Sequence, residues 1–464
     1  MKVLKFGGSS VANAENIKKV VEIVRKVEGD AVVVLSAMQG TTDKLIDAGR
    51  MAERGDDSYV AKFDEIRSQH TAAITALSLD QTVTADIETR FNDLADILRG
   101  VALIGELSTR TLDNILSFGE LLSTRIASAY LTSVGTGNTW LDSRDLIRTD
   151  SNFGNAAVDF KATNELVAKA NIKGLTIVPG FVATDANGNT TTLGRGGSDY
   201  TAAIFAAALD VEVLEIWTDV SGMMTADPRF VRSVRDIPRI TYREAMELSH
   251  FGAKVVYPPT IQPVMAKGIP VWVKNTFAPD DFGTLIEAKS TDAEMVRGIT
   301  SIDKIAVLNL EGSGMVGVPG FSKRLFDALS RSQINVILIT QSSSEHSICV
   351  AIEERSANGA KAAVDREFEY EIAIGKIDLL RIETGLSILA LVGDNMRFHT
   401  GVSGRMFSTL GHNGVNIRAI AQGSSERNIS AIIDSADVRK AVNTLHEEFF
   451  SDGKKQINIF VAGV

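Results

Sequence analysis

The chain opens with Met1-Lys-Val-Leu-Lys5-Phe-Gly7-Gly8-Ser9-Ser10, in which a short apolar strand runs into a glycine-rich loop. The alternation over Met1–Phe6 predicts a strand, and apolar residues at helical spacing predict a helix over 13–28. Glycines let a backbone approach a phosphate group closely, and the start of a helix favours anions. Lys5 adds a positive charge beside the loop. An ordinary strand–helix turn next to a surface lysine would look the same, so the stretch alone leaves both interpretations open.

Strands and helices continue to alternate through residues 1–290. Ala31–Leu35 is a continuous run of mostly β-branched residues, which is typical of buried parallel strands. Residues 60–130 are mainly helical in pattern. Further short apolar strands are predicted at Leu175–Pro179, Val213–Thr218 and Val271–Val273. The pattern predicts an α/β fold in which helices cover both faces of a mainly parallel sheet, a three-layer sandwich.

The remaining residues contain an internal repeat. The segment Ile334-Asn-Val-Ile-Leu-Ile-Thr-Gln341 returns 81 positions later as Val415-Asn-Ile-Arg-Ala-Ile-Ala-Gln422. Before each copy, the spacing predicts a strand and then a helix: 305–310 with 322–331, and 387–392 with 403–412. Two β–helix–β–turn–β units are therefore expected, over 291–385 and 386–464. Such paired units resemble ACT domains, regulatory modules that bind amino acids; in proteins that carry them this way, one unit is inserted within the other.

Composition limits the function classes. A length of 464 residues predicts about three domains at roughly 150 residues each. The net charge of −10 argues against broad nucleic-acid or membrane binding, although a few local cations can still hold a small anion. The single cysteine, Cys349, allows no internal disulfide and fits a reducing compartment. The first residues show no signal-peptide pattern and no apolar run reaches membrane-spanning length, so a cytoplasmic protein is expected.

A second glycine-rich loop reads Gly194-Arg-Gly-Gly-Ser-Asp199 and opens the apolar helix predicted over 200–209. Arg195 can hold a carboxylate through two parallel hydrogen bonds. Ser198 can add a hydroxyl group, and Asp199 can orient the loop or the reacting groups. Ser198 or Asp199 can also act as a simple helix cap, which is compatible with a functional role.

Three polar side chains lie on shorter motifs. Glu120, in Ser117-Phe-Gly-Glu120, stands on an apolar helical stretch and is a candidate anchor for an ammonium group. A solvated helix glutamate is the alternative. Ser36 and Thr42 flank the turn after the buried strand 31–35, and ligands of open α/β sheets bind at the carboxyl ends of strands. Ordinary turn residues are the alternative there.

Further candidates could surround a nucleotide. Trp217-Thr-Asp-Val-Ser-Gly222 follows a predicted strand, Asp227-Pro-Arg229 follows it, and Phe251-Gly-Ala-Lys254 comes next. Each motif is weak alone, because Asp-Pro is more often only a turn. No nucleophilic triad and no cysteine–histidine metal cluster stands out in the sequence.

In identity, order and spacing these motifs resemble the aspartate kinases of the amino-acid-kinase family, over essentially the whole chain. The resemblance implies ATP-dependent phosphorylation of the aspartate side chain, with Mg²⁺. It implies that Lys5 and Asp199 serve the catalytic centre, and Met224 stands where many relatives carry tyrosine. The substrate residues it implies are Ser36, Thr42, Glu120, Arg195 and Ser198. The ATP residues it implies are Lys5, Gly7, Gly8, Ser9, Thr218, Asp219, Met224, Arg229 and Lys254.

The tail Ala421-Gln-Gly-Ser-Ser-Glu-Arg427 is especially similar to threonine-sensitive enzymes in which the kinase is fused to homoserine dehydrogenase. The resemblance implies threonine as effector at Gln341, Gln422 and Asn335, and a homo-oligomer formed through the ACT units. The last residues, Gln456–Val464, predict a strand that ends in Gly-Val, as the opening of a dinucleotide-binding domain does. A continuation into a dehydrogenase is therefore expected, and a plain terminal strand is the alternative.

The chemistry of the implied reaction fits the residues at hand. The aspartate carboxylate has a reference pKa of about 3.9, so it is already ionised near neutral pH and needs no general base. Two anions must instead be brought together, which requires cations, a metal on the phosphates and oriented backbone amides. Lys5, Arg195 and the two glycine loops supply such groups.

Three alternatives stay open. Gly312-Ser-Gly314-Met-Val-Gly317 fits the dinucleotide pattern G-x-G-x-x-G, but no acidic residue follows the next strand and the repeat lacks the pattern. A catalytically inactive amino-acid sensor is a second reading, against which Lys5, Arg195 and Asp199 argue. A kinase of another small acid is the third; the Ser36–Thr42 loop and the paired units favour aspartate.

Overall fold

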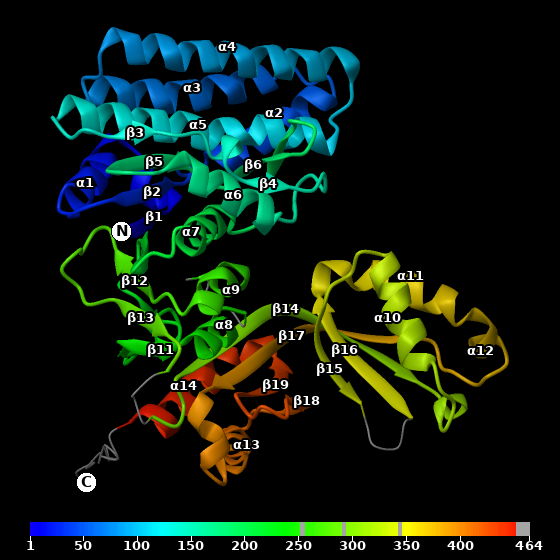
Figure 1. Ribbon diagram of the computed structural model, residues 1–464. Coiled ribbons are helices and arrows are strands. Elements are labelled where there is room, and N and C mark those ends of the chain that lie inside the picture. The colour runs from blue at the N-terminus through cyan, green and yellow to red at the C-terminus, as the bar shows by residue number, and fades with distance from the viewer. Residues whose placement is uncertain (251–255, 290–293, 342–345, 452–464) are drawn as a thin grey trace, which may run out of the picture. The chain divides into compact units, whose positions relative to one another are not determined.

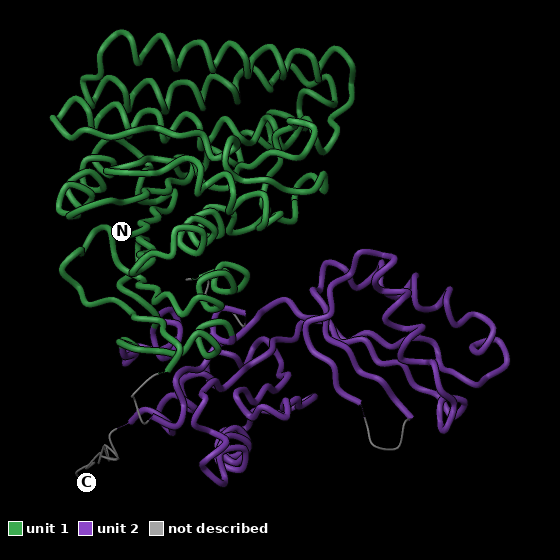
Figure 2. Tube along the Cα trace, viewed as in Figure 1, with its two compact units in different colours: residues 1–223, 236–246, 254–292 green, residues 224–235, 247–253, 293–464 purple. Residues whose placement is uncertain are grey.

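The computed structural model describes residues 1–250, 256–289, 294–341 and 346–451. The chain divides into two compact units, coloured separately in Figure 2. Unit 1 comprises residues 1–223, 236–246 and 254–292, and unit 2 comprises 224–235, 247–253 and 293–464. Within the described residues, no helix has both the length and the apolar character needed to cross a bilayer.

Unit 1 is built on an eight-stranded sheet with the order β11-β13-β12-β8-β1-β2-β5-β3. The ladders are parallel except that between β12 and β13. The sheet strands are β1 (Lys2–Phe6), β2 (Ala31–Leu35), β3 (Thr139–Trp140), β5 (Leu175–Pro179), β8 (Val213–Thr218), β11 (Arg239–Thr241), β12 (Val271–Asn275) and β13 (Thr284–Glu287). Smaller sheets contain β4 (Arg148–Thr149), β6 (Val182–Asp185) and β7 (Thr190–Thr192), and β9 (Met223–Met224) with β10 (Asp236–Ile237).

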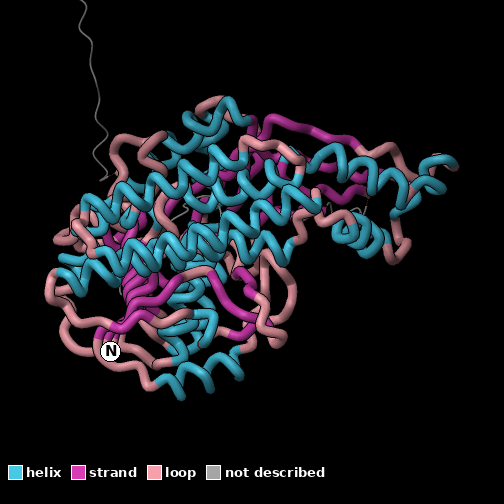
Figure 3. The backbone as a smooth tube through the Cα atoms, turned by 90° about the horizontal axis from the view of Figure 1, so that it is seen from above, coloured by secondary structure: helices cyan, strands magenta, loops and turns pink. Residues whose placement is uncertain are grey.

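Helices cover both faces of this sheet (Figures 1 and 3). One face carries α1 and α5 with the long helices α2 to α4 outside them, and the other carries α7, against which α9 packs. The helices of this part of the chain are α1 (Ala14–Val24), α2 (Thr41–Glu53), α3 (Tyr59–Ala76), α4 (Gln81–Ile104), α5 (Thr109–Ser133), α6 (Phe160–Ala170), α7 (Gly197–Ala208), α8 (Tyr242–His250) and α9 (Pro258–Lys267). The expected three-layer α/β fold is confirmed.

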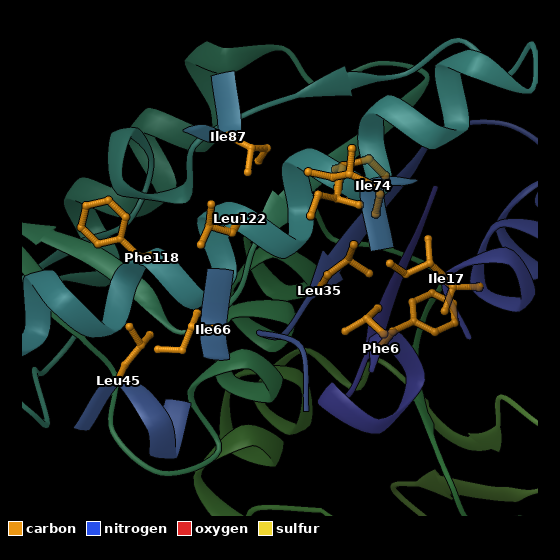
Figure 4. Close-up of a cluster of buried hydrophobic side chains, with 14 of the residues drawn as sticks. Phe6, Ile17, Leu35, Leu45, Ile66, Ile74, Ile87, Phe118 and Leu122 are labelled. Atoms are coloured by element: carbon orange, nitrogen blue, oxygen red, sulfur yellow. The ribbon is translucent and has the colours of Figure 1, made fainter. Parts of the chain in front are cut away.

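The core between the sheet and the α1–α5 face determines which way β1 presents its side chains. Alternate residues of a strand point to opposite faces. Leu4 and Phe6 are fully buried in this core, which also holds Ile17, Leu35 and Ile66 (Figure 4). Lys5 therefore points to the other face, which α7 covers. A fixed strand in a close-packed core gives Lys5 a defined direction.

Unit 2 contains a six-stranded sheet with the order β15-β16-β14-β17-β19-β18, in which every ladder is antiparallel. Its strands are β14 (Gly298–Glu311), β15 (Val336–Gln341), β16 (Ser347–Glu353), β17 (Arg381–Val392), β18 (Ile417–Gln422) and β19 (Asn428–Asp434). Its helices are α10 (Phe321–Arg331), α11 (Ala357–Glu367), α12 (Glu369–Ala373), α13 (Val402–His412) and α14 (Val438–Phe450). The two βαβ-type ACT modules expected from the repeat are confirmed.

The two ACT modules interleave in the central strands. The first half of β14 was not expected from the sequence: Ile299 belongs to the core with α13 and α14, whereas Leu308 belongs to the core with α10 and α11. The register slips between Ile302 and Ile305, where Lys304 has a φ of 59°. The second module thus takes a strand segment that precedes the first module in the chain. The domain limits 1–290, 291–385 and 386–464 stay a prediction.

A segment of the first 290 residues also belongs to unit 2. Ala226 and Val231 are buried in the core of the second ACT module. One face of α14 holds the same segment through three side chains. His446 Nε2 lies 2.9 Å from Thr225 Oγ1, Asn443 donates to the carbonyl of Phe230 at 2.8 Å, and Arg439 donates to the carbonyl of Arg229 at 2.9 Å. Residues 224–235 are therefore anchored in the second ACT module.

Candidate active site

A cavity of about 710 Å³ lies in unit 1 where the carboxyl ends of β1 and β2 meet the first turn of α7. Parallel α/β sheets bind ligands at this end of their strands. The structure brings eight of the predicted residues together in its lining: Lys5, Gly8, Ser36, Thr42, Glu120, Arg195, Ser198 and Asp199. They come from four segments spread over almost 200 positions, so the fold assembles the cavity.

An ion pair stands in this cavity. Lys5 Nζ lies 2.5 Å from Asp199 Oδ1, and Lys5 is only 8 % exposed. Lys5 comes from β1 and Asp199 from the first turn of α7, where the helix dipole also stabilises a carboxylate. The carboxylate holds the ammonium group at a fixed point beside the glycine loop. A cation held there can meet an incoming phosphate without rearrangement.

Helix α7 begins at the second glycine loop. Its N-terminal flanking residue, Gly196, has a φ of 68°, and no side chain caps this end of the helix. Gly197 and Ser198 in the first turn line the cavity, and Arg195 beside them is exposed. The start of a helix, an arginine and a hydroxyl group together form a site for an anion. The alternative in which Ser198 or Asp199 caps the helix is not supported, because no side chain forms a capping hydrogen bond at this end of α7.

Glu120 reaches the cavity from the buried helix α5. Gly119 makes this possible, because a Cβ atom there would lie 2.8 Å from the Cβ atom of Ala37. Ser123 Oγ donates to the carbonyl of Ser36 at 2.7 Å and fixes the same approach. The motif therefore presses the helix against the turn that carries Ser36 and Thr42.

The carboxyl group of Glu120 is buried, and one of its oxygens lacks a hydrogen-bond partner among the described residues. The residue is 4 % exposed, and its Oε2 has no hydrogen-bond partner among the described residues. Burial raises the pKa of Glu120 to about 8, against the opposing effects of a backbone hydrogen bond and the Lys5 charge. A buried acceptor without a partner is costly. A ligand that brings an ammonium group would supply the missing donor.

Sequence reasoning missed several lining residues, including Asp113, Phe181 and Thr192. Phe181 has a φ of 70°, a conformation that bulky residues rarely adopt, and its N–H donates to Thr201 Oγ1 at 2.9 Å. Such strain often accompanies functional sites. Asp113 stands seven positions before Glu120, on the same face of α5 by helical spacing, which is a signal that the sequence did contain.

The candidate nucleotide residues are divided between the units. Gly7 and Ser9 lie in the loop after β1, and the N–H of Gly7 donates to the carbonyl of Trp217 at 3.1 Å. Thr218 and Asp219 therefore lie beside this loop, at the end of β8. They join each other through a 3.2 Å hydrogen bond. None of the four lines the 710 Å³ cavity.

Met224 and Arg229 belong to unit 2, and neither lines the 710 Å³ cavity. Arg229 is exposed and forms an ion pair of 2.5 Å with Asp227. Lys254 lies outside the described residues, as does the predicted terminal strand 456–464. The ATP-binding roles of these residues stay predictions.

Two smaller cavities in unit 2 match the repeat. One, of about 310 Å³, is lined by Gln341, Ile348 and residues 315–322 without 316. The other, of about 270 Å³, is lined by Gln422, Ile429 and residues around 396–403. The sheet pairs Gln341 with Ile348 and Gln422 with Ile429 in the same register. Asn335 lies before β15, at the opposite end from Gln341, and is not among the lining residues.

No group of three or more histidine, cysteine, aspartate or glutamate side chains that could hold a metal occurs among the described residues. Mg²⁺ in kinases is commonly held by one or two carboxylates, waters and the substrate phosphates. Asp199 opens α7 after the second glycine loop, and Asp219 follows β8 beside the first, so the residues present fit Mg²⁺ that arrives with a nucleotide. The dinucleotide pattern at Gly312–Gly317 follows β14 of an antiparallel sheet, whereas that motif belongs to parallel βαβ units.

Comparisons with protein families agree with this architecture. The profile of the amino acid kinase family matches residues 1–275. An ACT domain profile matches twice, at residues 308–368 and 389–449.

Individual relatives cover almost the whole chain. Bifunctional aspartokinase/homoserine dehydrogenase 1 of Arabidopsis thaliana is 37 % identical over 97 % of this chain and 51 % of its own length. The chain thus spans about half the length of that relative. Aspartokinase 1 of the same plant is 34 % identical, over 97 % of this chain and 80 % of its own length. E. coli aspartokinase III in complex with aspartate and ADP superposes with a TM-score of 0.84 and 31 % identity, covering 97 % of this chain and 100 % of that one.

Proposed function

The chain belongs to the aspartokinases of the amino acid kinase family, and from this premise we propose that it transfers the γ-phosphoryl group of ATP to the side-chain carboxylate of L-aspartate. The product is 4-phospho-L-aspartate, and the step opens the synthesis of amino acids derived from aspartate. The observation that carries the proposal is the cavity in which Lys5, Asp199, Arg195 and Glu120 meet.

The charges of the cavity match the substrate. Arg195 is placed to bind a carboxylate of aspartate, with Ser198 and the first turn of α7 beside it. Glu120, with its unpartnered Oε2, is placed to accept the α-ammonium group. Ser36 and Thr42 supply hydroxyl groups in the same lining. An aspartate held at both ends presents its side-chain carboxylate in a fixed direction.

In the reaction, an oxygen of that carboxylate attacks the γ-phosphorus while the bond from phosphorus to the bridging oxygen breaks, and ADP leaves with the electron pair. No proton has to move, since the carboxylate is already ionised. Lys5 faces the charge that develops on the transferring group, and Asp199 holds Lys5 in place. Mg²⁺ supplies charge neutralisation on the phosphates when it is bound. The loop 7–9 and residues Thr218 and Asp219 are proposed to hold the nucleotide.

ACT domains support allosteric regulation by an amino acid, and E. coli aspartokinase III has been solved with lysine and aspartate. For this chain we propose threonine. Among the described residues, no charged side chain lines the Gln341 cavity, whereas Arg397 and Glu426 line the matching Gln422 cavity. An amide, backbone groups and Ser322 suit a small amino acid with a hydroxyl group.

Two further properties follow as proposals. β15 and β18 are the edge strands of the six-stranded sheet, and their outward residues Ile339 and Ile420 are 52 % and 42 % exposed. Exposed apolar side chains offer a contact surface to a second copy, so we propose a homo-oligomer formed through the ACT modules. Light scattering measures this directly. A cytoplasmic location is proposed from the single cysteine.

A coupled ADP-release assay tests the function. The purified chain is supplied with MgATP and, in turn, L-aspartate, L-glutamate and N-acetyl-L-aspartate, with and without threonine or lysine. Aspartate-dependent ADP release that threonine lowers is expected, and acetylation of the α-amino group should abolish it because Glu120 loses its partner. Turnover with glutamate alone would favour the second candidate, a kinase of another acidic amino acid. No turnover with any acid would favour an inactive sensor.

A further inference from the structure

The mechanism above leaves one buried carboxylate of the cavity without a role. Asp113 lies on α5 and is 1 % exposed, yet it contacts the cavity lining. Its Oδ2 accepts hydrogen bonds from the N–H groups of Gly154 and Thr192, both at 2.9 Å. Its Oδ1 accepts a third from Thr192 Oγ1 at 2.8 Å. Three donors converge on one carboxylate.

These bonds join three separate parts of the chain. Asp113 belongs to α5, Gly154 to the turn over 152–155, and Thr192 to the end of β7. The turn is also bound to the strand, because the N–H of Ala156 donates to the carbonyl of Thr192 at 2.9 Å. Asp113 therefore fixes both pieces to the helix that carries Glu120.

Both pieces support the second glycine loop. Thr192 precedes Gly194 by two positions and leads the chain directly into Arg195. On the other side, a Cβ atom at Gly194 would lie 2.6 Å from Asn155 Oδ1 and 3.2 Å from the carbonyl oxygen of Gly154. The turn thus packs against the loop at the residue before Arg195. Since Gly194 also has a φ of 71°, the loop can hold this position only as glycine.

We propose that Asp113 is a positioning residue that sets the separation between Arg195 and Glu120, the two groups that hold the ends of the amino-acid substrate. The inference rests on the proposed function of the cavity. Asp113 and Glu120 are seven positions apart on the same face of helix α5, and both line the cavity. The helix therefore holds the carboxylate that binds the loop at a fixed distance from the carboxylate that faces the ligand. Asp113 touches no reacting atom and acts through the loop.

A carboxylate suits this task better than an amide. All three partners of Asp113 donate hydrogen, and an ionised carboxylate has only acceptor atoms. Asparagine has the same shape but no charge; its Oδ1 can accept both N–H bonds only if the Thr192 hydroxyl turns to accept from the NH₂ group, so the bonds that hold the loop and the turn become weaker. The loop should then shift rather than unfold. A displacement of about 1 Å in a substrate-holding group can cost up to roughly a hundredfold in rate.

The test is Asp113→Asn, with kinetics measured separately for aspartate and MgATP. The KM for aspartate should rise about tenfold while the KM for ATP changes less than about twofold. Thr192→Val removes only the Oδ1 bond, and about a threefold rise in the aspartate KM is expected. Thr191→Val is the matched control, because Thr191 lies next to Thr192 on β7 but does not contact Asp113 through a hydrogen bond. The substitution breaks a buried hydrogen bond of 2.7 Å between Thr191 and Thr149. That variant should lose stability but keep its aspartate KM.

The outcomes separate the possibilities. If Asp113→Asn and Thr191→Val lose similar stability and neither changes the aspartate KM, Asp113 only holds the fold together and the proposal is overturned. If Asp113→Asn does not fold, Thr192→Val decides, and an unchanged aspartate KM in that variant overturns the proposal as well. Arg195→Ala is measured in parallel. If the aspartate KM is unchanged in Arg195→Ala, the proposed substrate site itself is refuted. If the aspartate KM rises in Arg195→Ala but is unchanged in Asp113→Asn, only the positioning role of Asp113 is refuted.

Discussion

The 710 Å³ cavity of unit 1 and the Gln341 cavity of unit 2 differ in the charge of their linings. The first brings charged groups together, with the Lys5–Asp199 ion pair, Arg195 and the buried Glu120. The second, within the described residues, is lined by glycine, apolar side chains, one hydroxyl group and one amide. Charges in low-dielectric surroundings interact strongly and discriminate sharply between ligands, whereas neutral linings give modest binding energies. The comparison fits the proposed division of roles, in which unit 1 transfers the phosphoryl group and unit 2 binds the effector.

Loss of the central cation should give the largest effect. Lys5→Ala should lower kcat by about 10²-fold or more, because stabilisation of the transferring phosphoryl group is lost while the fold persists. Lys2→Ala on the same strand is the control, since Lys2 is 40 % exposed and pairs only loosely with Glu215. The rate of ADP release at saturating aspartate and MgATP gives kcat for both variants. A folded Lys5→Ala enzyme with near-normal kcat would contradict the catalytic role of Lys5, and with it the functional difference between the two cavities.

Arg195 tests the charge of the loop. Arg195→Ala should lower kcat/KM for aspartate by roughly ten- to a hundredfold, and Arg195→Lys should recover only part of it, because lysine keeps the charge but not the two-pronged geometry. ATP binding, measured by titration calorimetry, should change little. The exposed Arg99→Ala serves as control. Equal kinetics in the Arg195 variants and the control would reduce Arg195 to a loop residue.

The buried carboxyl group predicts a pH dependence. Burial raises the pKa of Glu120 to about 8, so the empty enzyme holds it protonated at neutral pH. The ammonium group of aspartate needs the ionised form, so kcat/KM for aspartate should rise up to about tenfold per pH unit below pH 8 and level off above it. Glu120→Gln should flatten this rise.

The same group links pH to stability with a defined sign. Its pKa in the folded state lies above the ordinary value of 4.5, so the empty folded protein binds more protons than the unfolded chain between these values. The melting temperature of the ligand-free protein should therefore fall as pH rises from about 5 to 8, and less so in Glu120→Gln. An equal pH dependence in both proteins would contradict the buried, unpartnered state.

The effector cavities should show the smallest changes. Gln341→Ala and Gln422→Ala should each raise the threonine concentration for half-inhibition several-fold, since a single neutral hydrogen bond contributes about 1 kcal/mol. Basal activity should stay within twofold of normal. Gln81→Ala, an exposed position in unit 1, is the control. Inhibition by lysine without any response to threonine would contradict the choice of threonine as effector.

Local patterns were sufficient where neighbouring residues determine the structure. The sequence predicted β2 and β5 with their observed limits, and the glycine loop at the start of α7. The early part of β14 was missed because residues 298–302 form a strand only through pairing with residues 388–392 of β17, far along the chain. Asp113 was missed for the same reason, since its partners lie 41 and 79 positions away. The attachment of residues 224–235 to α14 has no local signal at all.

That attachment has a consequence for how the protein is made. Thr225 and His446 are separated by 221 positions, and a ribosome adds roughly 5–20 residues per second, so the segment waits on the order of 10 to 45 s for its partner helix. During this time Ala226 and Val231, which end in the core of the second ACT module, have nothing to cover them. Unit 1 can be synthesised to residue 292 and still carry an unpacked apolar loop. We expect a chain released at that point to aggregate or be degraded, so that only polypeptides reaching α14 mature into enzyme and each active molecule carries its own regulator.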